Sequence, residues 1–359
     1  MKQTKTAKGP SFLIVSLRYS GDVLLSTPLS SSIKKRLPEA TIDYLVFEGT
    51  QGVLCKNPHV RTVLTVPPES KDIRFFASIW KRYDYSIGTN PSDRTNIHCA
   101  GTGRTSIGFS YFTPHKDWWK KIILSQCRFY NDQMHIVPLI LTQLELLGIP
   151  AHPRVVMGHD KADEEFVRTH LGEKDYIILH PYSRKDYKYW PPQAWATLAS
   201  LIREKLRLKP VFTVSPNPAE AGVLKDIMSS SHSSFFAFHQ PYNMCQLAAA
   251  IKGSMGFIGV DTVVTHIAAA MDISTIALFG PSLARHWGPW SNDSSAKSPY
   301  TDQGGMQRSG VVTIMKKDWA CVPCNKETCE ISNDGRMECM AAITPEEVFD
   351  ELVNMIKRS

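Results

Sequence analysis

Segments with strand-like and helix-like patterns alternate along almost the whole of this 359-residue chain. Residues 12–17 form an apolar run typical of a buried strand, and residues 21–36 carry apolar side chains at helical spacing. Further strands are predicted over residues 42–46, 60–66 and 85–88. Strands that alternate with helices indicate a parallel, doubly wound sheet. The chain is therefore predicted to be an α/β protein.

A break in this alternation divides the chain. The stretch Ile149–Pro153 holds two prolines and no periodic pattern, so it is the predicted linker region. A second series follows, with strands at 176–180 and 256–260 and helices at 161–171, 192–206, 218–229 and 244–252. Because the chain is too long for one compact core, two α/β domains are expected. The simplest architecture is two Rossmann-like halves with a cleft between them.

Composition favours a soluble globular protein, since 43% of residues are hydrophobic and 21% are charged. The sequence contains no run of about 18 apolar residues, so no membrane-spanning helix is predicted. The apolar segment after the basic start is interrupted by Arg18 and Asp22, so we predict no secretion signal and a cytoplasmic protein. The net charge of +7 indicates either an ordinary solvated surface or attraction to polyanions such as phosphorylated sugars or anionic lipid.

One segment combines tryptophans with lysines. Residues 115–124 read HKDWWKKIIL, with adjacent Trp118 and Trp119 followed by Lys120 and Lys121. Such a segment can lie in a membrane interface, with its rings among the lipid headgroups and its lysines on phosphates. A buried tryptophan pair with solvated lysines fits the same pattern, so the sequence leaves both interpretations open.

Two polar turns follow predicted strands of the second half. The stretch Gly259–His266 joins an apolar run to an Ala-rich helix, and Ile276–Ser282 repeats the arrangement. Backbone N–H groups and the positive end of a helix dipole at such turns attract anions. Two neighbouring turns of this kind suit a diphosphate.

Two further loops carry candidate chemistry. Asp22 follows the first strand at a helix start, where a carboxylate either stabilises the helix or removes a proton from a hydroxyl. This loop lacks the GxGxxG spacing of a dinucleotide site, which argues against a dehydrogenase. The loop 180–191 contains the hydroxyl of Ser183 and the cations Arg184, Lys185 and Lys188. These groups are suitable phosphate ligands, or the loop is basic merely because it is exposed to solvent.

Four sequence stretches, taken together and in order, resemble the lipopolysaccharide heptosyltransferase family. They are GDVLLSTP at 21–28, KYWP at 188–191, GVDT at 259–262 with His266, and LFGPS at 278–282. Arg18, the run HIAAA at 266–270 and the stretch WGPWSN at 287–292 are most similar to the core heptosyltransferase III (WaaQ-type) branch.

This resemblance implies a GT-B fold, in which two Rossmann-like domains face each other across a cleft. It implies an acceptor domain over residues 1–155, a donor domain over 156–340, and a C-terminal helix within 341–359 that packs back on the first domain. The implied reaction is an inverting, metal-independent transfer of heptose from ADP-heptose to the inner core of lipopolysaccharide. It requires no cofactor and no nucleic acid, and it places the protein at the cytoplasmic face of the inner membrane, in peripheral contact with it.

The resemblance also implies roles for individual residues. Asp22 matches the general base, and Arg18 is a candidate for contacts with the acceptor. The donor-binding set comprises Ser183, Lys188, Glu220, Asp261, Thr262 and His266, with Lys188 meeting the diphosphate and Glu220 near the nucleoside. The chain departs from some family members at Val263, where they have glycine after the Asp-Thr pair.

Physical chemistry agrees with this assignment. The leaving ADP gains negative charge, which an ammonium group and helix-start N–H groups near Thr262 stabilise without a metal. Asp261 would be repelled by a diphosphate, so we expect it to accept hydrogen bonds from sugar hydroxyls. His266 lies four residues after Thr262 on the same helix face, where it either reaches the donor or serves as a packing residue.

A cluster of cysteines closes the second half. Cys321, Cys324, Cys329 and Cys339 are half of the eight cysteines of the chain. In a cytoplasmic protein this clustering favours a metal over disulfides, with structural zinc ahead of an iron–sulfur cluster. Reduced cysteines that bind no metal are the alternative.

Two other functions remain open from the residues alone. A nucleotide-sugar epimerase of the same two-domain shape would need no acceptor. A non-catalytic module that binds anionic glycolipid would not need to bind ADP tightly.

Overall fold

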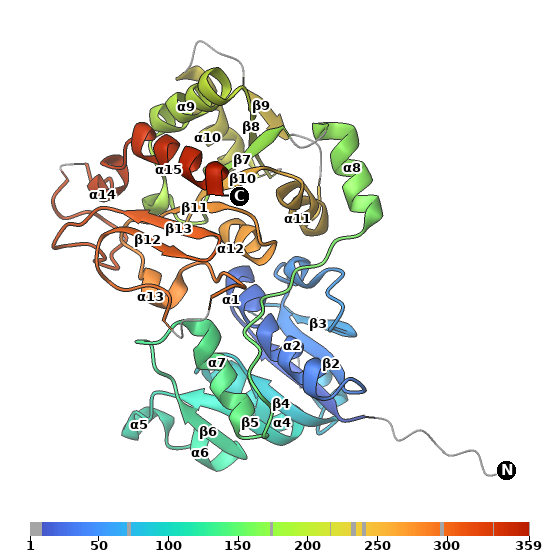
Figure 1. Cartoon of the computed structure of the whole chain (residues 1–359). Coiled ribbons are helices and arrows are strands. Elements are labelled where there is room, and N and C mark those ends of the chain that lie inside the picture. Colours follow the sequence, from blue (N-terminus) through green and yellow to red (C-terminus); the bar gives the residue numbers. More distant parts are fainter. Residues whose placement is uncertain are drawn as a thin grey trace. The chain divides into compact units, whose positions relative to one another are not determined.

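A computed structural model describes residues 9–69, 73–172, 175–215, 217–230, 235–238, 242–294, 298–332 and 334–358. It divides the chain into two compact units, Met1–Gly158 and His159–Ser359. Each unit contains one sheet with helices around it (Figure 1). The α/β fold class is as predicted from the alternating pattern.

The first unit is built on a six-stranded parallel sheet. Its strands are β1 (Ser11–Ser16), β2 (Thr41–Phe47), β3 (Thr62–Val66), β4 (Tyr83–Gly88), β5 (Gly103–Ser110) and β6 (Gln126–Phe129). Their order is β3-β2-β1-β4-β5-β6, the order of a Rossmann sheet. Strand β1 is central because its apolar run Phe12–Val15 is at most 1% exposed.

The helices of the first unit lie between its strands along the chain, except for α7, which follows the last strand β6. They are α1 (Ser20–Leu25), α2 (Thr27–Arg36), α3 (Ile73–Ser78), α4 (Asp93–Thr102), α5 (Pro114–Asp117), α6 (Lys120–Ile123) and α7 (Ile136–Glu145), with a 3-10 turn at Gln51–Leu54. The single helix expected over 21–36 is divided at Ser26. Pro28 explains the division, because it lacks the N–H that a continuous helix would bond to the carbonyl of Leu24.

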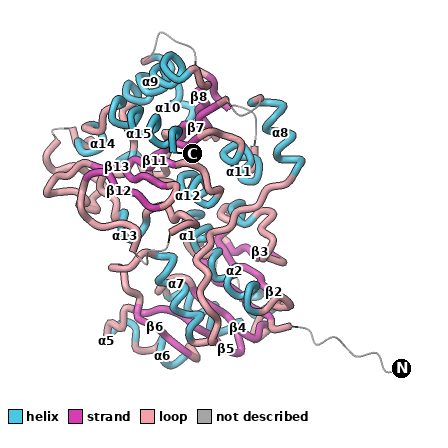
Figure 2. Tube along the Cα trace, viewed as in Figure 1, coloured by secondary structure: helices cyan, strands magenta, loops and turns pink. Residues whose placement is uncertain are grey.

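The segment after α7 is bound to the first unit rather than acting as a free linker. From residue 149 to 160 it has neither helix nor strand and passes α2 as the pink loop of Figure 2. Buried hydroxyls of α2 hold its backbone: Thr27 accepts from the N–H of Val156 at 2.9 Å, and Ser32 accepts from that of His152 at 2.8 Å. The division between the units falls after Gly158, three residues beyond the expected boundary at 155.

The second unit has a seven-stranded sheet of order β12-β13-β11-β10-β7-β8-β9. Only the edge pair β12–β13 is antiparallel among these described strands. The strands are β7 (Tyr176–His180), β8 (Lys209–Thr213), β9 (Phe236–Phe238), β10 (Gly256–Val260), β11 (Thr275–Leu278), β12 (Gly305–Ser309) and β13 (Val312–Lys316). Read from β9 to β13, the parallel part repeats the order of the first sheet.

The helices of the second unit are α8 (Lys161–Leu171), α9 (Pro192–Leu201), α10 (Pro218–Ser229), α11 (Met244–Lys252), α12 (Val263–Ala270), α13 (Ala284–Trp287), α14 (Glu338–Ala341) and α15 (Pro345–Arg358). A 3-10 turn at Asp186–Lys188 and a π-helical turn at Ile202–Leu206 complete the set.

The C-terminal helix α15 contributes to the core of the second unit. Its apolar face, with Val348, Leu352 and Met355, lies there beside α9, and its expected packing on the first domain stays a prediction. The buried carboxylate of Glu351 fixes the helix there, because it accepts hydrogen bonds from Arg308 at 2.6 Å and from Thr313 at 2.9 Å.

None of the helices in the described parts of the chain has the length and apolar character needed to traverse a lipid bilayer.

Candidate functional site

Both sheets have a point where the strand order reverses, and the candidate residues follow the strands at these points. In a parallel α/β sheet, ligands bind outside the carboxyl ends of the strands at such a reversal. The reversal lies between β1 and β4 in the first unit and between β7 and β10 in the second. Arg18 and Asp22 follow β1, whereas Ser183 and Lys188 follow β7, and Asp261 follows β10.

Asp22 lies in the first turn of α1 and is largely buried. Its carboxylate is 3.3 Å from Nε of Arg18, and its side chain is 14% exposed. Burial raises the pKa of Asp22 from 3.8 to about 6, although Arg18 and the backbone N–H groups of Asp22 and Tyr19 partly oppose this. A carboxylate with a pKa near 6 is a stronger base than an exposed aspartate and is still ionised at neutral pH.

Three further side chains of the first unit were not predicted from the sequence. Burial raises the pKa of Tyr130, which lies close enough to Asp22 and Arg18 for both charges to act on it, and its ring packs edge-on against that of Tyr111 at 5.4 Å. Asn90 follows β4, is 2% exposed, and its Nδ2 has no hydrogen-bond partner. The sequence signal for Asn90 is its place two residues after the predicted strand 85–88.

Lys188 and Asp261 form the centre of the candidate site in the second unit. Nζ of Lys188 lies 2.5 Å from Oδ2 of Asp261, and the two side chains are 20% and 9% exposed. The pair forms because β7 and β10 are adjacent parallel strands, so the loops after them meet at one edge. In this contact the Asp261 carboxylate fixes the position of the Lys188 ammonium, and the expected hydrogen bonds from sugar hydroxyls to Asp261 stay a prediction.

Ser183 joins this pair through its hydroxyl, which donates to the backbone carbonyl of Asp261 at 3.3 Å. The loop that carries Ser183 is held by Tyr189, whose hydroxyl donates to the carbonyl of Ser183 at 3.1 Å. The structure therefore brings together Ser183, Lys188 and Asp261, three residues of the donor-binding set that the resemblance implies, and donor binding itself stays a prediction.

Thr262 and His266 lie at the start of α12. Thr262 is the N-cap residue but makes no side-chain capping bond, so it leaves the helix N–H groups for a ligand. His266 is 7% exposed and its Nδ1 has no hydrogen-bond partner. Burial lowers the pKa of His266 to about 4, while Asp261 raises it and Lys188 lowers it further. The imidazole is thus neutral at pH 7 and lies close to the Lys188–Asp261 pair.

Glu220 belongs to a different group of contacts. Its carboxylate accepts a 2.8 Å hydrogen bond from the N–H of Ser215, and its charge raises the pKa of both Tyr182 and Tyr242, after burial as the main cause. The hydroxyl of Tyr182 is buried without a partner. No contact between Glu220 and Lys188 or Asp261 is found among the described residues.

The second predicted turn, after β11, packs against the cysteine segment. A Cβ at Gly280 would lie 2.7 Å from Cγ of Met340 and 3.3 Å from Sγ of Cys339. The carbonyl of Pro281 also accepts a hydrogen bond from the N–H of Asn325 at 2.8 Å. Gly280 is therefore needed for packing against Met340 and Cys339, and the expected approach of a diphosphate to this turn stays a prediction.

The four clustered cysteines lie near one another. Cys339 is buried and Cys321 is exposed, while Cys324 and Cys329 are intermediate. Burial, with the neighbouring Cys324, Cys329 and Cys321, raises the pKa of Cys339 to about 11. Across the described ranges, no three His, Cys, Asp or Glu side chains are arranged to hold a metal ion.

A cavity of about 900 Å³ in the second unit is lined by Lys185, Tyr187, Glu327 and Arg336, among others. Lys188, Asp261 and His266 do not line this cavity. We place the candidate site at the strand ends, where the charged and unpartnered buried groups lie.

A family model described as glycosyltransferase family 9 (heptosyltransferase) matches residues 100–307, more than half of the chain. The chain is 25% identical over 293 residues to lipopolysaccharide heptosyltransferase 3 of Escherichia coli, covering 77% of this chain and 85% of that protein. It is 26% identical over 337 residues to lipopolysaccharide heptosyltransferase 1 of Pseudomonas aeruginosa, covering 88% and 86%.

Solved structures share the fold. The glycosyltransferase family 9 structure from Veillonella parvula matches with a TM-score of 0.76 at 18% identity, covering 98% of each chain. The E. coli ADP-heptose lipopolysaccharide heptosyltransferase II matches with a TM-score of 0.74 at 16% identity, over 97% of this chain and 99% of that one. These matches confirm the predicted GT-B fold class and the resemblance on which it rested.

Proposed function

The chain belongs to glycosyltransferase family 9, and from that premise we propose that it transfers heptose from ADP-heptose to the inner core of lipopolysaccharide. We further propose that the transfer inverts the anomeric centre, needs no metal, and takes place at the cytoplasmic face of the inner membrane. The observation that carries the proposal is the Lys188–Asp261 pair beside the N-terminus of α12.

The donor side of the proposal follows from charge. When the bond between the anomeric carbon and the diphosphate oxygen breaks, ADP leaves with the electron pair and gains negative charge. The Lys188 ammonium and the uncapped N–H groups of α12 stabilise that charge, because both are fixed before the reaction. Neutral His266 and the Ser183 hydroxyl offer hydrogen bonds to a phosphate or a sugar hydroxyl without adding charge.

The acceptor side depends on Asp22. As the acceptor hydroxyl attacks the anomeric carbon, its proton passes to the Asp22 carboxylate, so one O–H bond and one C–O bond break while new ones form. The raised pKa of Asp22 suits this step. Arg18, which is 3.3 Å from Asp22, is proposed to contact the acceptor.

Glu220 is proposed to lie near the nucleoside of the donor. Its contacts with Ser215 and its effect on Tyr182 support a polar pocket lined by an aromatic ring. Such a pocket offers a hydroxyl partner for the ribose and a ring face for the base.

The test is transfer itself. Purified protein is incubated with ADP-heptose and a truncated core acceptor, and the acceptor mass is read by mass spectrometry. We expect the acceptor to gain one heptose in the presence of a chelator. Lys188→Met should lose most of this activity, whereas Lys317→Met, which removes an exposed ion pair with Glu347, should retain it.

Two results would contradict the proposal. Conversion of the nucleotide sugar without any acceptor would indicate an epimerase. Absence of ADP binding by calorimetry would indicate a module that binds glycolipid without catalysis.

A further inference from the structure

In the segment from Pro114 to Leu124, charged side chains are buried and large apolar side chains are exposed. Trp118 and Trp119 form the turn between α5 and α6 and have helical backbone angles. Residues three or four apart share a helix face. Asp117 and Lys120 lie on the buried face, whereas Trp118 and Ile122 on the outer face are 60% and 71% exposed.

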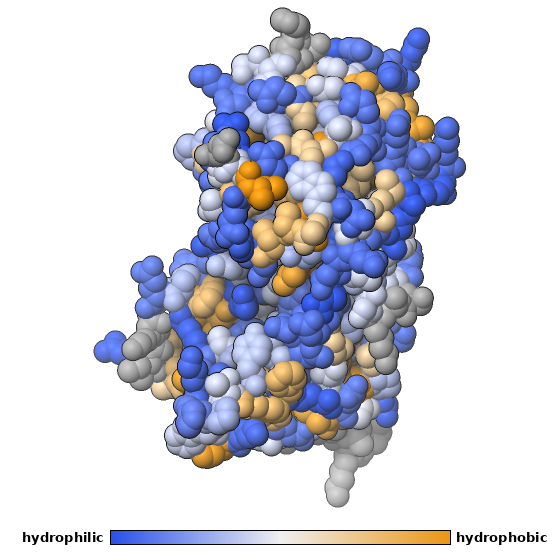
Figure 3. All heavy atoms as spheres, turned by 90° about the vertical axis from the view of Figure 1, so that its left-hand side faces the viewer, coloured by the Kyte–Doolittle hydropathy of each residue, from blue (hydrophilic) through white to orange (hydrophobic). Residues whose placement is uncertain are grey.

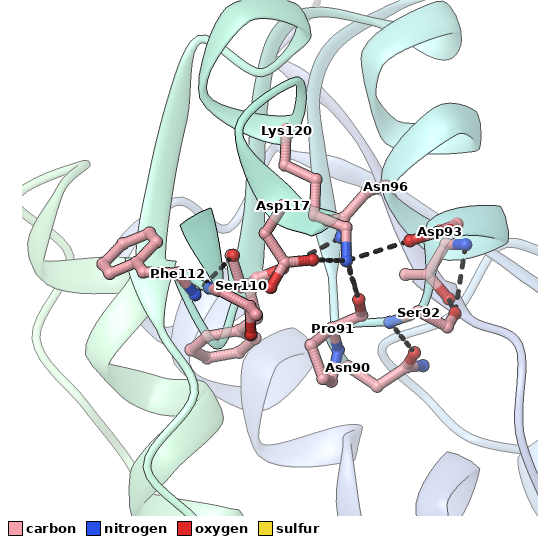
Figure 4. Close-up of polar contacts among 12 residues, drawn as sticks. Asn90, Pro91, Ser92, Asp93, Asn96, Ser110, Phe112, Asp117 and Lys120 are labelled. Atoms are coloured by element: carbon pink, nitrogen blue, oxygen red, sulfur yellow. Dashed lines mark hydrogen bonds and ion pairs between the residues drawn. The ribbon is translucent and has the colours of Figure 1, made fainter. Parts of the chain in front are cut away.

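The buried face is held by an ionic contact. Nζ of Lys120 lies 2.7 Å from Asp117, 2.9 Å from Asp93 and 2.7 Å from the carbonyl of Pro91. Figure 4 marks these three contacts with dashed lines. Burial lowers the pKa of Lys120, but the hydrogen bonds to Asp117 and Asp93 outweigh it and raise the pKa. Leu124 adds an apolar anchor in the core of the first unit. The segment is thus fixed to the unit by its charged side.

The exposed apolar side chains are concentrated here. The described residues include thirteen large, exposed hydrophobic side chains, and five of them lie within residues 111–129: Tyr111, Trp118, Ile122, Ile123 and Phe129. Figure 3 shows apolar atoms among hydrophilic ones on the face of the first unit that carries α5 in Figure 1. Soluble proteins rarely gather exposed apolar groups in this way without a partner.

Charge identifies the partner. The exposed Lys116 and Lys121 flank the pair Trp118 and Trp119 in the sequence, and no ion pair to either lysine is found within the described ranges. The carboxylates of Asp117 and Asp93 are engaged by Lys120. The Lys121 ammonium lies over the ring of Phe112, 4.2 Å from its centroid, and keeps its positive charge. A surface of aromatic and aliphatic side chains with flanking exposed lysines matches the interface of an anionic lipid bilayer.

We propose that residues 115–123, with Phe129, form a membrane-docking surface for anionic lipid. The proposal extends the proposed function by assigning the membrane contact to one surface, and it rests on that function for its biological purpose. The surface adjoins the end of β5, which is followed by Tyr111. Burial and then Asp132 raise the pKa of Tyr111, and both Arg18 and Lys120 lie near enough to oppose this. Docking there would present a lipid-anchored sugar to the part of the first unit that holds Asp22.

The test is sedimentation of the full chain with vesicles of phosphatidylglycerol or phosphatidylcholine, without donor or acceptor. We expect wild-type protein to bind phosphatidylglycerol vesicles, and the double variant Trp118→Ser/Ile122→Ser to bind about tenfold more weakly. Lys116→Glu/Lys121→Glu should weaken binding to phosphatidylglycerol and remove its salt dependence. Ile331→Ser is the matched control, because Ile331 is 65% exposed in the second unit.

Three outcomes would overturn the proposal: no binding by wild-type protein, equal binding by the Trp118→Ser/Ile122→Ser variant, or a change from dimer to monomer in that variant without loss of vesicle binding. The last outcome would assign the surface to a second copy of the chain. Transfer to a water-soluble acceptor should be unchanged in the variant. Failure of that transfer in wild-type protein would instead contradict the proposed function and leave the vesicle result standing.

Discussion

Replacing Asp22 with asparagine should abolish transfer and stabilise the protein at the same time. The pKa of Asp22 is about 6 in the folded state and 3.8 in the unfolded chain. Because the folded state holds this proton more tightly, the contribution of the protonated Asp22 carboxyl to stability is fully present below pH 3.8 and is lost as the pH rises through about 6. A difference of about two pKa units corresponds to about 3 kcal/mol.

Asparagine does not titrate, so the variant keeps this stability at neutral pH. We expect Asp22→Asn to exceed wild type by up to about 3 kcal/mol in free energy of unfolding at about pH 8, and by nothing at about pH 3.5. Urea unfolding at both pH values, followed by circular dichroism, measures this difference. Transfer activity should be lost at every pH.

Asp84→Asn is a control of opposite sign. A hydrogen bond from the N–H of Ser11 lowers the pKa of Asp84, so its carboxylate contributes stability above the usual pKa, and this is lost on acidification. Its replacement should weaken the protein at neutral pH without affecting transfer. Equal stability of Asp22→Asn and wild type at both pH values would refute the reasoning about Asp22.

Three further predictions follow from the same contacts. The kcat/KM of wild type should fall as the pH drops below about 6, because Asp22 must be ionised to accept the proton, and the pH profile of initial rates measures this. Lys120→Met leaves the buried Asp117 carboxylate unpaired and should cost about 3–5 kcal/mol in urea unfolding; an unchanged midpoint would contradict the role assigned to Lys120. Lys188→Met should weaken ADP binding by about tenfold or more in calorimetry, since it removes a charge-assisted contact; an unchanged affinity would move the diphosphate away from Lys188.

Periodicity was sufficient where a segment carries its own apolar pattern. The predicted strands at 176–180 and 256–260 and the predicted helices at 161–171, 218–229 and 244–252 are confirmed with the same bounds. Their ends coincide with local signals, such as the capping box of Asp160 at the start of α8.

Helices and strands that form only because of tertiary contacts were not predicted from the sequence. Helix α4 has the polar sequence DRTNIHCAGT and begins at the Ser92 cap, and β5 contains two glycines and two serines. Both depend on neighbouring elements. Asn96 of α4 donates to the carbonyl of Phe109 in β5 at 2.8 Å. Gly103 of β5 has no room for a side chain, because a Cβ there would lie 2.3 Å from Oγ of Ser86. Such contacts do not appear in a local sequence pattern.

The same limit applies to the candidate site. The sequence identified Lys188 and Asp261 separately, but their ion pair joins residues 73 positions apart and depends on the pairing of β7 with β10. The pKa of Asp22 depends on burial, and the choice between the two interpretations of the Trp118 segment depends on exposure. Neither quantity follows from residue type.

A crystal structure of the protein with bound ADP tests the central claim most directly, namely that the leaving nucleotide is held at the strand reversal of the second sheet. We predict that the β-phosphate contacts Nζ of Lys188 and the first N–H groups of α12. ADP bound elsewhere, for example in the cavity lined by Lys185 and Arg336, would contradict the account.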